Sequence, residues 1–266
     1  MVQRIAIGML IVIAMMAIFA GRIAPAHYAM QFRELPNSPP SHQHWLGTDD
    51  VGRDRFSRVL YGTRISLLLA PAAALLSTLL AAILGGLPGY LGGTWSRLAL
   101  SCVDLFLSLP WLFVIIMARG LLPLDVSPMT SALLTFLLLG LLGWAFSARV
   151  LRASAANLRN AGFVLQARAS GLRGVRLFVV HVLPNLKPIL MAQFWISIPV
   201  FILAEANLGI LGLGITEPMP SWGGLLRELE GMFSLSDAPW KLVPLALLVL
   251  VVSCFELALN KEEYAV

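Results

Sequence analysis

Long apolar runs, separated by short polar stretches, are the feature that most limits what this chain can fold into. About six windows approach the length of ~20 residues that an α-helix needs to cross ~30 Å of hydrocarbon. With 58% hydrophobic and 12% charged residues among 266, the chain is too apolar for an ordinary soluble domain. The sequence therefore predicts an all-α, polytopic membrane protein.

The expected spans are divided by polar stretches rich in glycine and proline. We place them at residues 5–20, 65–90, 98–118, 129–148, 188–204 and 242–259. Glycines around Pro88 are expected to loosen or break the inner end of the second span, and Pro110 is expected to kink the third.

Three segments are expected along the chain: a first transmembrane helix in residues 1–24, an extracytoplasmic segment in 25–63, and a core of five further transmembrane helices in 64–266. Ala24-Pro25-Ala26 has the small-residue pattern of a cleavage site, so a removable signal peptide is the alternative to an uncleaved first span. The segment that follows emerges outside in either case.

A basic stretch of about residues 149–187 sets the orientation. It contains Arg149, Arg152, Arg159, Arg168, Arg173 and Arg176. No acidic residue occurs between Asp125 and Glu205. Short loops rich in arginine stay in the cytoplasm, so this stretch and both termini are expected there. The same rule explains the net charge of +5 without nucleic acid as a partner.

Within the basic stretch, Gly171 separates two pieces that are compatible with helix, and Leu183-Pro184 marks where the next element starts or bends. A helix, a glycine turn and a second helix would present a compact knob. This pattern favours a protein-docking role over a shapeless basic loop.

Acidic residues fall within or near the expected spans at Asp104, Glu205 and Glu256. A charge near the bilayer centre costs roughly 2.5–3.5 kcal/mol on insertion scales, so such groups usually face a cavity or a partner. Asp104 and Glu205 are candidates for a polar pathway, and hydrogen bonding between helices is the alternative. Glu256 is expected at the membrane interface.

The sequence carries no pattern typical of catalysis or metal binding. It lacks H-E-x-x-H and a nucleophile elbow, and none of its three lysines precedes Ser or Thr, as a phosphate-binding P-loop requires. Cys102 and Cys254 lie far apart, and the histidines do not cluster. We therefore expect no catalytic residue, no metal and no cofactor, and any energy from ATP must come through another subunit.

The basic stretch resembles the E-A-A-x3-G-x9-I-x-L-P motif of permease subunits of ABC importers, in which this loop docks on the ATPase subunit. Gly171 and Leu183-Pro184 match, whereas Leu165 replaces the Glu, Gln166 the first Ala and His181 the Ile. The resemblance implies an ATPase-coupling loop formed by Leu165, Gln166, Ala167, Arg168, Ala169, Ser170, Gly171, Leu172, Arg173 and Gly174.

Residues 46–66, L-G-T-D-D-V-G-R-D-R-F-S-R-V-L-Y-G-T-R-I-S, closely resemble a block of dipeptide/oligopeptide/nickel permeases, specifically their C-type subunit. Shorter stretches match in the same order at 89–93, 103–110, 204–214 and 220–223. The motif residues are Gly47, Thr48, Asp49, Gly52, Arg53, Asp54, Ser57, Arg58, Trp222 and Gly223. The family's tail, roughly G-D-x-L-R-D, is replaced by L-A-L-N-K-E-E-Y-A-V in residues 257–266.

The resemblance implies a type I ABC importer permease fold in a bacterial cytoplasmic (inner) membrane, with residues 64–266 as the permease core. The implied partners are a homologous second permease, two cytoplasmic ABC ATPase subunits that bind ATP, a periplasmic or surface solute-binding protein, and membrane lipid. The solute would be peptide-like or otherwise small. A stand-alone ion-coupled transporter that uses Asp104 and Glu205 is the alternative.

Overall fold

The computed structural model describes residues 1–123, 126–229 and 238–259. These residues are mostly helical, and their only β pairings are two isolated bridges, Gln31–Arg53 and Thr48–Asp54. The all-α prediction is confirmed. The end of the chain from residue 260, where the family's tail motif is replaced, lies outside the described residues.

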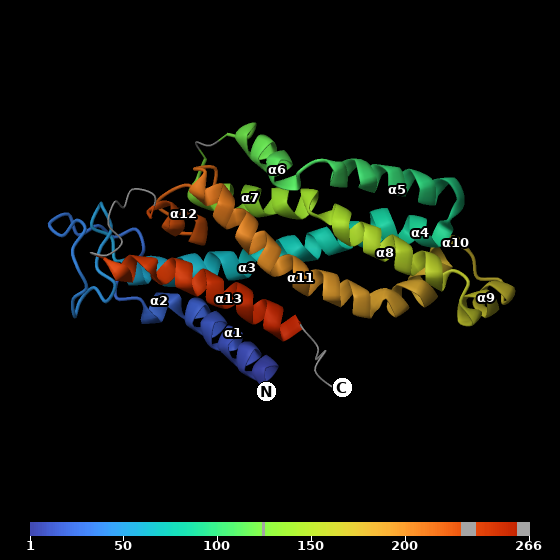
Figure 1. Cartoon of the computed structure of the whole chain (residues 1–266), viewed down its shortest axis with the longest axis horizontal. Helices are drawn as coiled ribbons and strands as arrows, with labels where there is room; N and C mark the ends of the chain where they lie inside the picture. The colour runs from blue at the N-terminus through green and yellow to red at the C-terminus, as the bar shows by residue number, and fades with distance from the viewer. Residues whose placement is uncertain (124–125, 230–237, 260–266) are drawn as a thin grey trace. The chain divides into compact units, whose positions relative to one another are not determined.

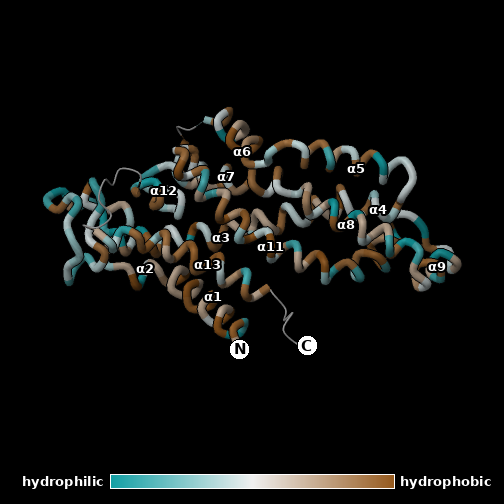
Figure 2. The backbone as a smooth tube through the Cα atoms, viewed as in Figure 1, coloured by the Kyte–Doolittle hydropathy of each residue, from teal (hydrophilic) through white to brown (hydrophobic). Residues whose placement is uncertain are grey.

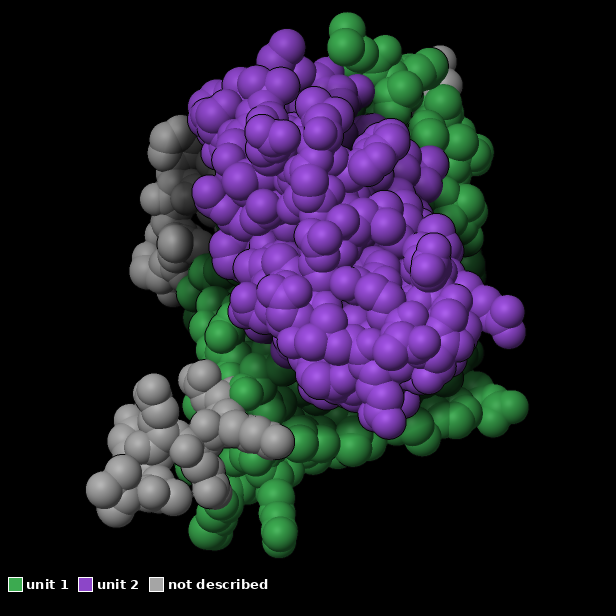
Figure 3. Space-filling model, turned by 90° about the vertical axis from the view of Figure 1, so that its right-hand side faces the viewer, with its two compact units in different colours: residues 1–70, 119–136, 199–266 green, residues 71–118, 137–198 purple. Residues whose placement is uncertain are grey.

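The chain forms two compact units (Figure 3). Unit 1 comprises residues 1–70, 119–136 and 199–266, and unit 2 comprises residues 71–118 and 137–198. The two units are defined by contacts within the fold, whereas the expected segments 1–24, 25–63 and 64–266 are defined by their position relative to the membrane. The division into these three segments stays a prediction.

Unit 1 contains both termini of the chain. Its helices are α1 (Val2–Ile18), α2 (Ala20–Ile23), the first part of α3 (Arg55–Ala81), the first part of α7 (Pro128–Leu142), the end of α11 (Leu183–Ile210), α12 (Trp222–Arg227), η4 (Pro239–Leu242) and α13 (Val243–Leu259). The first and last of these lie side by side (Figure 1). There the Gln3 side-chain amide donates to the Ala258 carbonyl at 2.9 Å.

Unit 2 begins within α3. Its elements are the end of α3, η1 (Ala82–Gly86), α4 (Leu87–Leu91), α5 (Gly93–Ser108), most of α6 (Trp111–Gly120), the end of α7, α8 (Trp144–Leu158), α9 (Gly162–Ala169), α10 (Gly174–Leu177), η2 (Phe178–Val182) and the start of α11. Two apolar clusters form its core. One surrounds Trp144 and Leu151, and the other surrounds Tyr90 and Leu177.

Two glycines allow the helix that runs from α3 into α4 to approach α8 closely. A Cβ on Gly85 would lie 2.2 Å from the carbonyl oxygen of Ala148, and one on Gly89 would lie 2.4 Å from that of Arg152. Gly85 and Gly89 are four residues apart, and so are Ala148 and Arg152, so the two contacts lie along one face of each helix. Small residues at this spacing let two membrane helices come into backbone contact.

Two short π-helical turns each precede a proline. The turn Ala82–Gly86 leads to Pro88, and the turn Phe178–Val182 leads to Pro184. Proline lacks the N–H of the regular helical ladder, and a π turn is one way to accommodate the irregularity. The second span is therefore loosened near Pro88 as expected, but its helix continues to Leu91.

Among the described residues, four helical stretches are long and apolar enough to cross a membrane: Arg55–Leu91, Pro128–Leu158, Gly174–Ile210 and Pro239–Leu259. Leu75, Leu79 and Ile83 are each more than half exposed on the first of them, as suits a lipid-facing surface. Figure 2 shows hydrophobic residues along these helices and hydrophilic residues in the segment that precedes α3.

The remaining expected spans differ in form. The third is a pair, α5 and α6, bent by 79° at a break that contains Pro110, which confirms the predicted kink. The first is α1, an apolar helix of 17 residues. The start expected for the fifth span, near Pro188, is wrong, because the helix runs continuously from Gly174. Likewise α8 extends into the basic stretch as far as Leu158.

Replacing Gly85 with Val is expected to destabilise unit 2 by about 1–3 kcal/mol, because the new Cβ would collide with the backbone of α8. The measurement is the melting temperature of the purified protein in detergent. Gly8→Val in α1 is the matched control, since a Cβ there meets nothing within 4 Å. Equal melting temperatures for the two variants would contradict the close packing of these helices.

Candidate functional site

Two glycines shape the segment that leads into α3. Gly47 and Gly52 have positive φ angles of 68° and 81°. A Cβ on Gly47 would lie 2.3 Å from the Ser38 carbonyl oxygen, and one on Gly52 would lie 2.2 Å from that of Phe32. Both the conformation and the space require glycine, which gives a physical reason for these two motif positions.

Asp49 and Asp54, both buried, hold this segment with their carboxylates. Asp49 accepts from the backbone N–H groups of Val51 at 3.1 Å and Arg53 at 2.7 Å. Asp54 accepts from the N–H and the hydroxyl of Ser57, each at 2.7 Å, and so caps the first turn of α3. The second oxygen of Asp54 lies 2.9 Å from His44 Nδ1.

Three arginines of this segment connect it to the region around α12. Arg58, which is fully buried, lies 2.8 Å from Glu217 and 3.3 Å from Glu228, and its Nε is 3.5 Å from Asp49. Arg53 pairs with Asp49 at 2.6 Å and with Glu217 at 2.5 Å, and Arg55 pairs with Glu228 at 2.7 Å. The charge network, as we call this set, consists of Asp49, Arg53, Arg55, Arg58, Glu217 and Glu228.

The charge network balances three arginines against three carboxylates. Burial raises the pKa of Glu228, and the nearby Arg58 and Arg55 oppose that shift. Burial lowers the pKa of Arg53, but its bond to Asp49 and the charge of Glu217 outweigh this, so the net direction is upward. Part of the network, including Arg53, Glu217 and Glu228, lines a cavity of about 500 Å³.

The start of α12 packs tightly within unit 1. Ser221 caps the helix by accepting from the Gly224 N–H at 3.1 Å. Trp222 is fully buried and donates from its indole nitrogen to the Thr63 hydroxyl at 3.1 Å. A Cβ on Gly223 would lie 2.7 Å from the Glu205 carbonyl oxygen, so this motif position also requires the smallest residue.

The two candidate pathway acids lie in different units. Glu205 in unit 1 is fully buried beside Ser221, Gly223 and Ser66, yet its carboxylate oxygens have no hydrogen bond of normal geometry among the described residues. Asp104 in unit 2 is partly exposed and pairs with Arg149 at 3.0 Å, which links α5 to α8. The pathway role of either acid stays a prediction.

The basic stretch contains a compact loop in unit 2. Helix α9 ends at Ala169, and Gly171 follows with a φ of +91°. The Leu172 N–H donates to the Ala167 carbonyl, and the Gly171 N–H donates to that of Arg168, each at 3.1 Å. This pair of bonds is a Schellman motif, which ends a helix at a left-handed glycine. The expected helix, glycine turn and second helix are therefore present.

One face of this loop is buried and another is exposed. Val164 and Ala167 pack into the apolar cluster around Tyr90 and Leu177, and Leu172 packs against it. Phe163 and Leu165, 39% and 47% exposed, stand out from the loop. Leu165 occupies the position of the motif's glutamate, so this part of the loop presents an apolar side chain in place of a carboxylate.

All eight motif residues of the segment 46–58 lie in unit 1, as do Trp222 and Gly223. The sequence reasoning missed His44 and Arg55 near them, and it also missed Glu217 and Glu228. One sequence pattern could have pointed to Glu217, because this residue lies in the same short stretch as the P-S-W-G match. No pattern in the sequence pointed to Glu228.

Helical stretches of membrane-spanning length, with a compact loop between two of them, define a multi-pass membrane protein. Residues 66–260 match the family model described as a binding-protein-dependent transport system inner membrane component. The chain belongs to this family of transport permeases, and it is a multi-pass inner membrane protein.

Relatives in other bacteria support this assignment. The chain is 32% identical over 238 residues to the oligopeptide transport system permease protein OppC of Bacillus subtilis (strain 168), an alignment that covers 89% of this chain and 75% of the relative. It is 32% identical over 231 residues to the dipeptide transport system permease protein DppC of the same organism, covering 87% and 70%. It is 37% identical over 224 residues to OppC of Mycobacterium tuberculosis (strain ATCC 25618 / H37Rv), covering 82% and 74%.

These similarities confirm the resemblance stated from the sequence. They support a permease subunit of an importer over a stand-alone ion-coupled transporter.

Replacing Arg58 with Met is expected to cost about 3 kcal/mol of stability, because the three carboxylates of the charge network, of which Asp49 is fully buried and Glu228 is mostly buried, then share only two arginines. The measurement is thermal unfolding of the purified protein. Arg33→Met is the control, since Arg33 is exposed in the same segment and has no ion pair within the part of the chain that the structure describes. A melting temperature of Arg58→Met equal to that of the control would show that the charge network does not stabilise the fold.

Proposed function

We propose that this chain is one of two homologous permease subunits that enclose the translocation pathway of an ATP-driven importer for a peptide-like or other small solute. Family membership and the names of the relatives support this proposal. Two cytoplasmic ATPase subunits bind and hydrolyse ATP, and a solute-binding protein delivers the solute from outside. This chain supplies pathway wall and lever, with no catalytic residue, cofactor or metal of its own.

The observation that carries the proposal is the loop formed by α9, Gly171 and α10. Its buried face fixes it to the apolar cluster of unit 2, so it can move as a body with the helices beneath it. Its exposed apolar residues, Phe163 and Leu165, suit burial against a partner. A loop that is anchored to the core on one face and exposes apolar side chains on another is suited to bind an ATPase subunit.

Both ends of the loop join membrane-length helical stretches. One stretch ends at Leu158 and the other starts at Gly174. A displacement of the loop by the ATPase subunits therefore acts directly on two spans. Domain closure in the ATPase pair would drive the spans between outward- and inward-open states by a rigid-body motion.

The orientation follows from charge. Arginine-rich short loops remain in the cytoplasm, so the loop faces the ATPase subunits and residues 25–63 face outside. On the outside, the charge network holds the segment 46–58 against Glu217 and Glu228 as a preformed surface for the solute-binding protein.

Replacing Gly171 with Val tests the coupling role. A non-glycine residue in the left-handed region costs about 1–2 kcal/mol, and a β-branched residue tolerates it poorly, so the loop should change shape while the spans stay folded. In proteoliposomes that contain the complete importer, solute uptake is expected to fall at least tenfold. ATP hydrolysis should no longer respond to the loaded binding protein.

Two further variants separate coupling from strain. Gly93→Val creates similar strain, because Gly93 has a φ of +58° and no atom within 4 Å of its added Cβ, but it lies outside the loop. This control should retain uptake. Gly171→Asn, which suits a left-handed φ better than Val, should recover part of it. Normal uptake by Gly171→Val would rule out the coupling role.

Cysteine labelling tests the orientation. In a Cys102→Ser background, Ser170→Cys is expected to resist a membrane-impermeant maleimide in intact cells and to react after lysis. His42→Cys, in the segment before α3, should react in intact cells with their cell envelope made permeable to the reagent. Both positions are exposed in the structure. Labelling of Ser170→Cys from outside would invert the proposed topology.

A further inference from the structure

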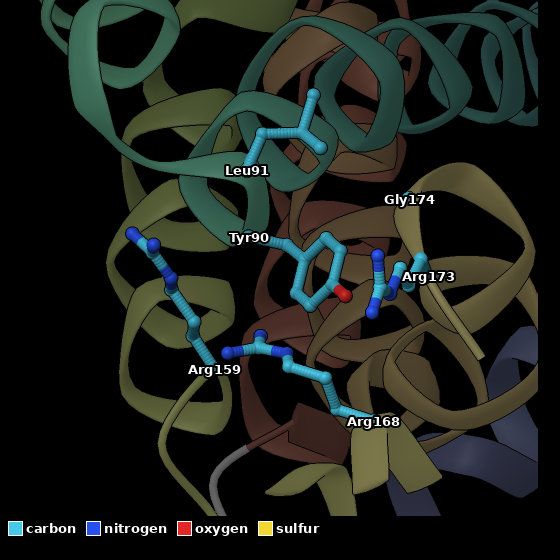
Figure 4. Close-up of a pocket in the computed structure, with 6 residues that line it drawn as sticks. All are labelled: Tyr90, Leu91, Arg159, Arg168, Arg173 and Gly174. Carbon is cyan, nitrogen blue, oxygen red and sulfur yellow. The ribbon is translucent and has the colours of Figure 1, made fainter. Parts of the chain in front are cut away.

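We infer that unit 2 carries a binding site for a phosphate-bearing anion, supplied by the headgroup of an anionic membrane phospholipid. The site is a pocket of about 330 Å³ beside the loop (Figure 4). It is lined by Tyr90, Leu91, Arg159, Arg168, Arg173 and Gly174. The inference concerns lipid, although Arg168, Arg173 and Gly174 also belong to the proposed ATPase-coupling loop.

The polar groups of the pocket suit a phosphate. Figure 4 shows the Tyr90 ring directed between the side chains of Arg168 and Arg173, with Arg159 on the other side of the ring. Guanidinium groups offer several N–H donors in a planar fork that matches phosphate oxygens, and a phenol adds one donor. The ring itself is 4% exposed and packs in the apolar cluster, so its position is fixed.

The positive charge of the pocket has no carboxylate available within unit 2. Asp104 is the only acidic residue in the sequence of this unit, and it already pairs with Arg149 at 3.0 Å. Arg152, the next arginine along α8, donates to Ser96 at 3.1 Å. Across the described residues, no hydrogen bond or ion pair of a side chain is assigned to Arg159, Arg168 or Arg173.

The backbone makes room for one of these arginines. Gly92 ends α4 with a φ of +71°, and a Cβ on it would lie only 1.7 Å from a terminal nitrogen of Arg159. The guanidinium of Arg159 therefore rests against the glycine backbone. Any larger residue at position 92 would displace it.

The depth of the pocket points to lipid as the source of the anion. The pocket is lined by Tyr90, at the expected inner end of the second span, and by Leu91 beside it. The inner end of a span lies near the boundary between hydrocarbon and headgroups, where lipid phosphate resides. Basic pockets between transmembrane helices at this depth bind anionic headgroups, and exposed Leu91 and Val175 can contact an acyl chain.

The test measures lipid retained by the purified full-length chain in detergent, by native mass spectrometry. The protein is offered equal amounts of phosphatidylglycerol and phosphatidylcholine with the same acyl chains. We expect selective retention of phosphatidylglycerol. Arg168→Gln and Arg173→Gln should each weaken it about fivefold, the factor that corresponds to about 1 kcal/mol per arginine near an anionic surface.

Arg176→Gln is the matched control, because it removes the same charge from an exposed position on α10 outside the pocket. It should leave retention within about twofold of the wild type. Tyr90→Phe removes only the hydroxyl and should weaken retention less than either arginine variant. A melting temperature within the wild-type range for each variant confirms that the fold is intact.

Four outcomes would overturn the inference. The first is equal retention of the two lipids, and the second is a loss in Arg176→Gln as large as in the pocket variants. The third is full displacement of phosphatidylglycerol by millimolar inorganic phosphate, which would assign the pocket to a free anion. If the pocket variants keep the lipid but lose an associated ATPase subunit, the pocket serves an acidic side chain of a protein and the lipid assignment is wrong.

Discussion

A backbone that crosses a bilayer must satisfy its own hydrogen bonds, and this constraint governs the arrangement of the helices. Pro88 and Pro184 each remove one N–H from a long helical stretch, and in both cases a π turn precedes the proline while the helix goes on. Pro110 has a different outcome, since α5 and α6 meet there at 79°. Because the helix through Pro184 is continuous, the loop at Gly171 is attached directly to a membrane-length stretch. The lever role proposed for the loop depends on this continuity.

Charge is distributed very unevenly between the two units. Unit 1 pairs buried arginines with carboxylates in the charge network, so the charges of this network are neutralised within the unit. Unit 2 has Asp104 as its only acidic residue in the sequence and many arginines. The basic residues of unit 2 are therefore free to serve topology, to meet a partner, or to hold an anion from the membrane. One sequence thus contains a region stabilised by ion pairs and a region whose cations face outward.

Features set by local sequence could be predicted, and those set by distant contacts could not. The glycine turn at Gly171 and the break near Pro110 follow from backbone chemistry, so sequence reasoning found them. The same reasoning expected the helix near Pro88 to be loosened or broken, and the choice between the two could not be made from the sequence, because the packing of Gly85 against α8 is a tertiary contact. The ion-pair partners of Arg58 could not be predicted for a similar reason, since Glu217 and Glu228 lie 159 and 170 positions away. The motif identifies Asp49, Arg53 and Arg58, and only the fold shows which glutamates pair with the arginines.

Arg58 has a consequence for how unit 1 opens. It is fully buried, and its guanidinium contacts carboxylates from three separate places in the chain. Neither the stretch around Asp49 nor the stretch from Glu217 to Glu228 can detach without leaving buried charge unpaired. We therefore expect the two stretches to share one opening event, in which their amide protons exchange with solvent as a single cooperative unit.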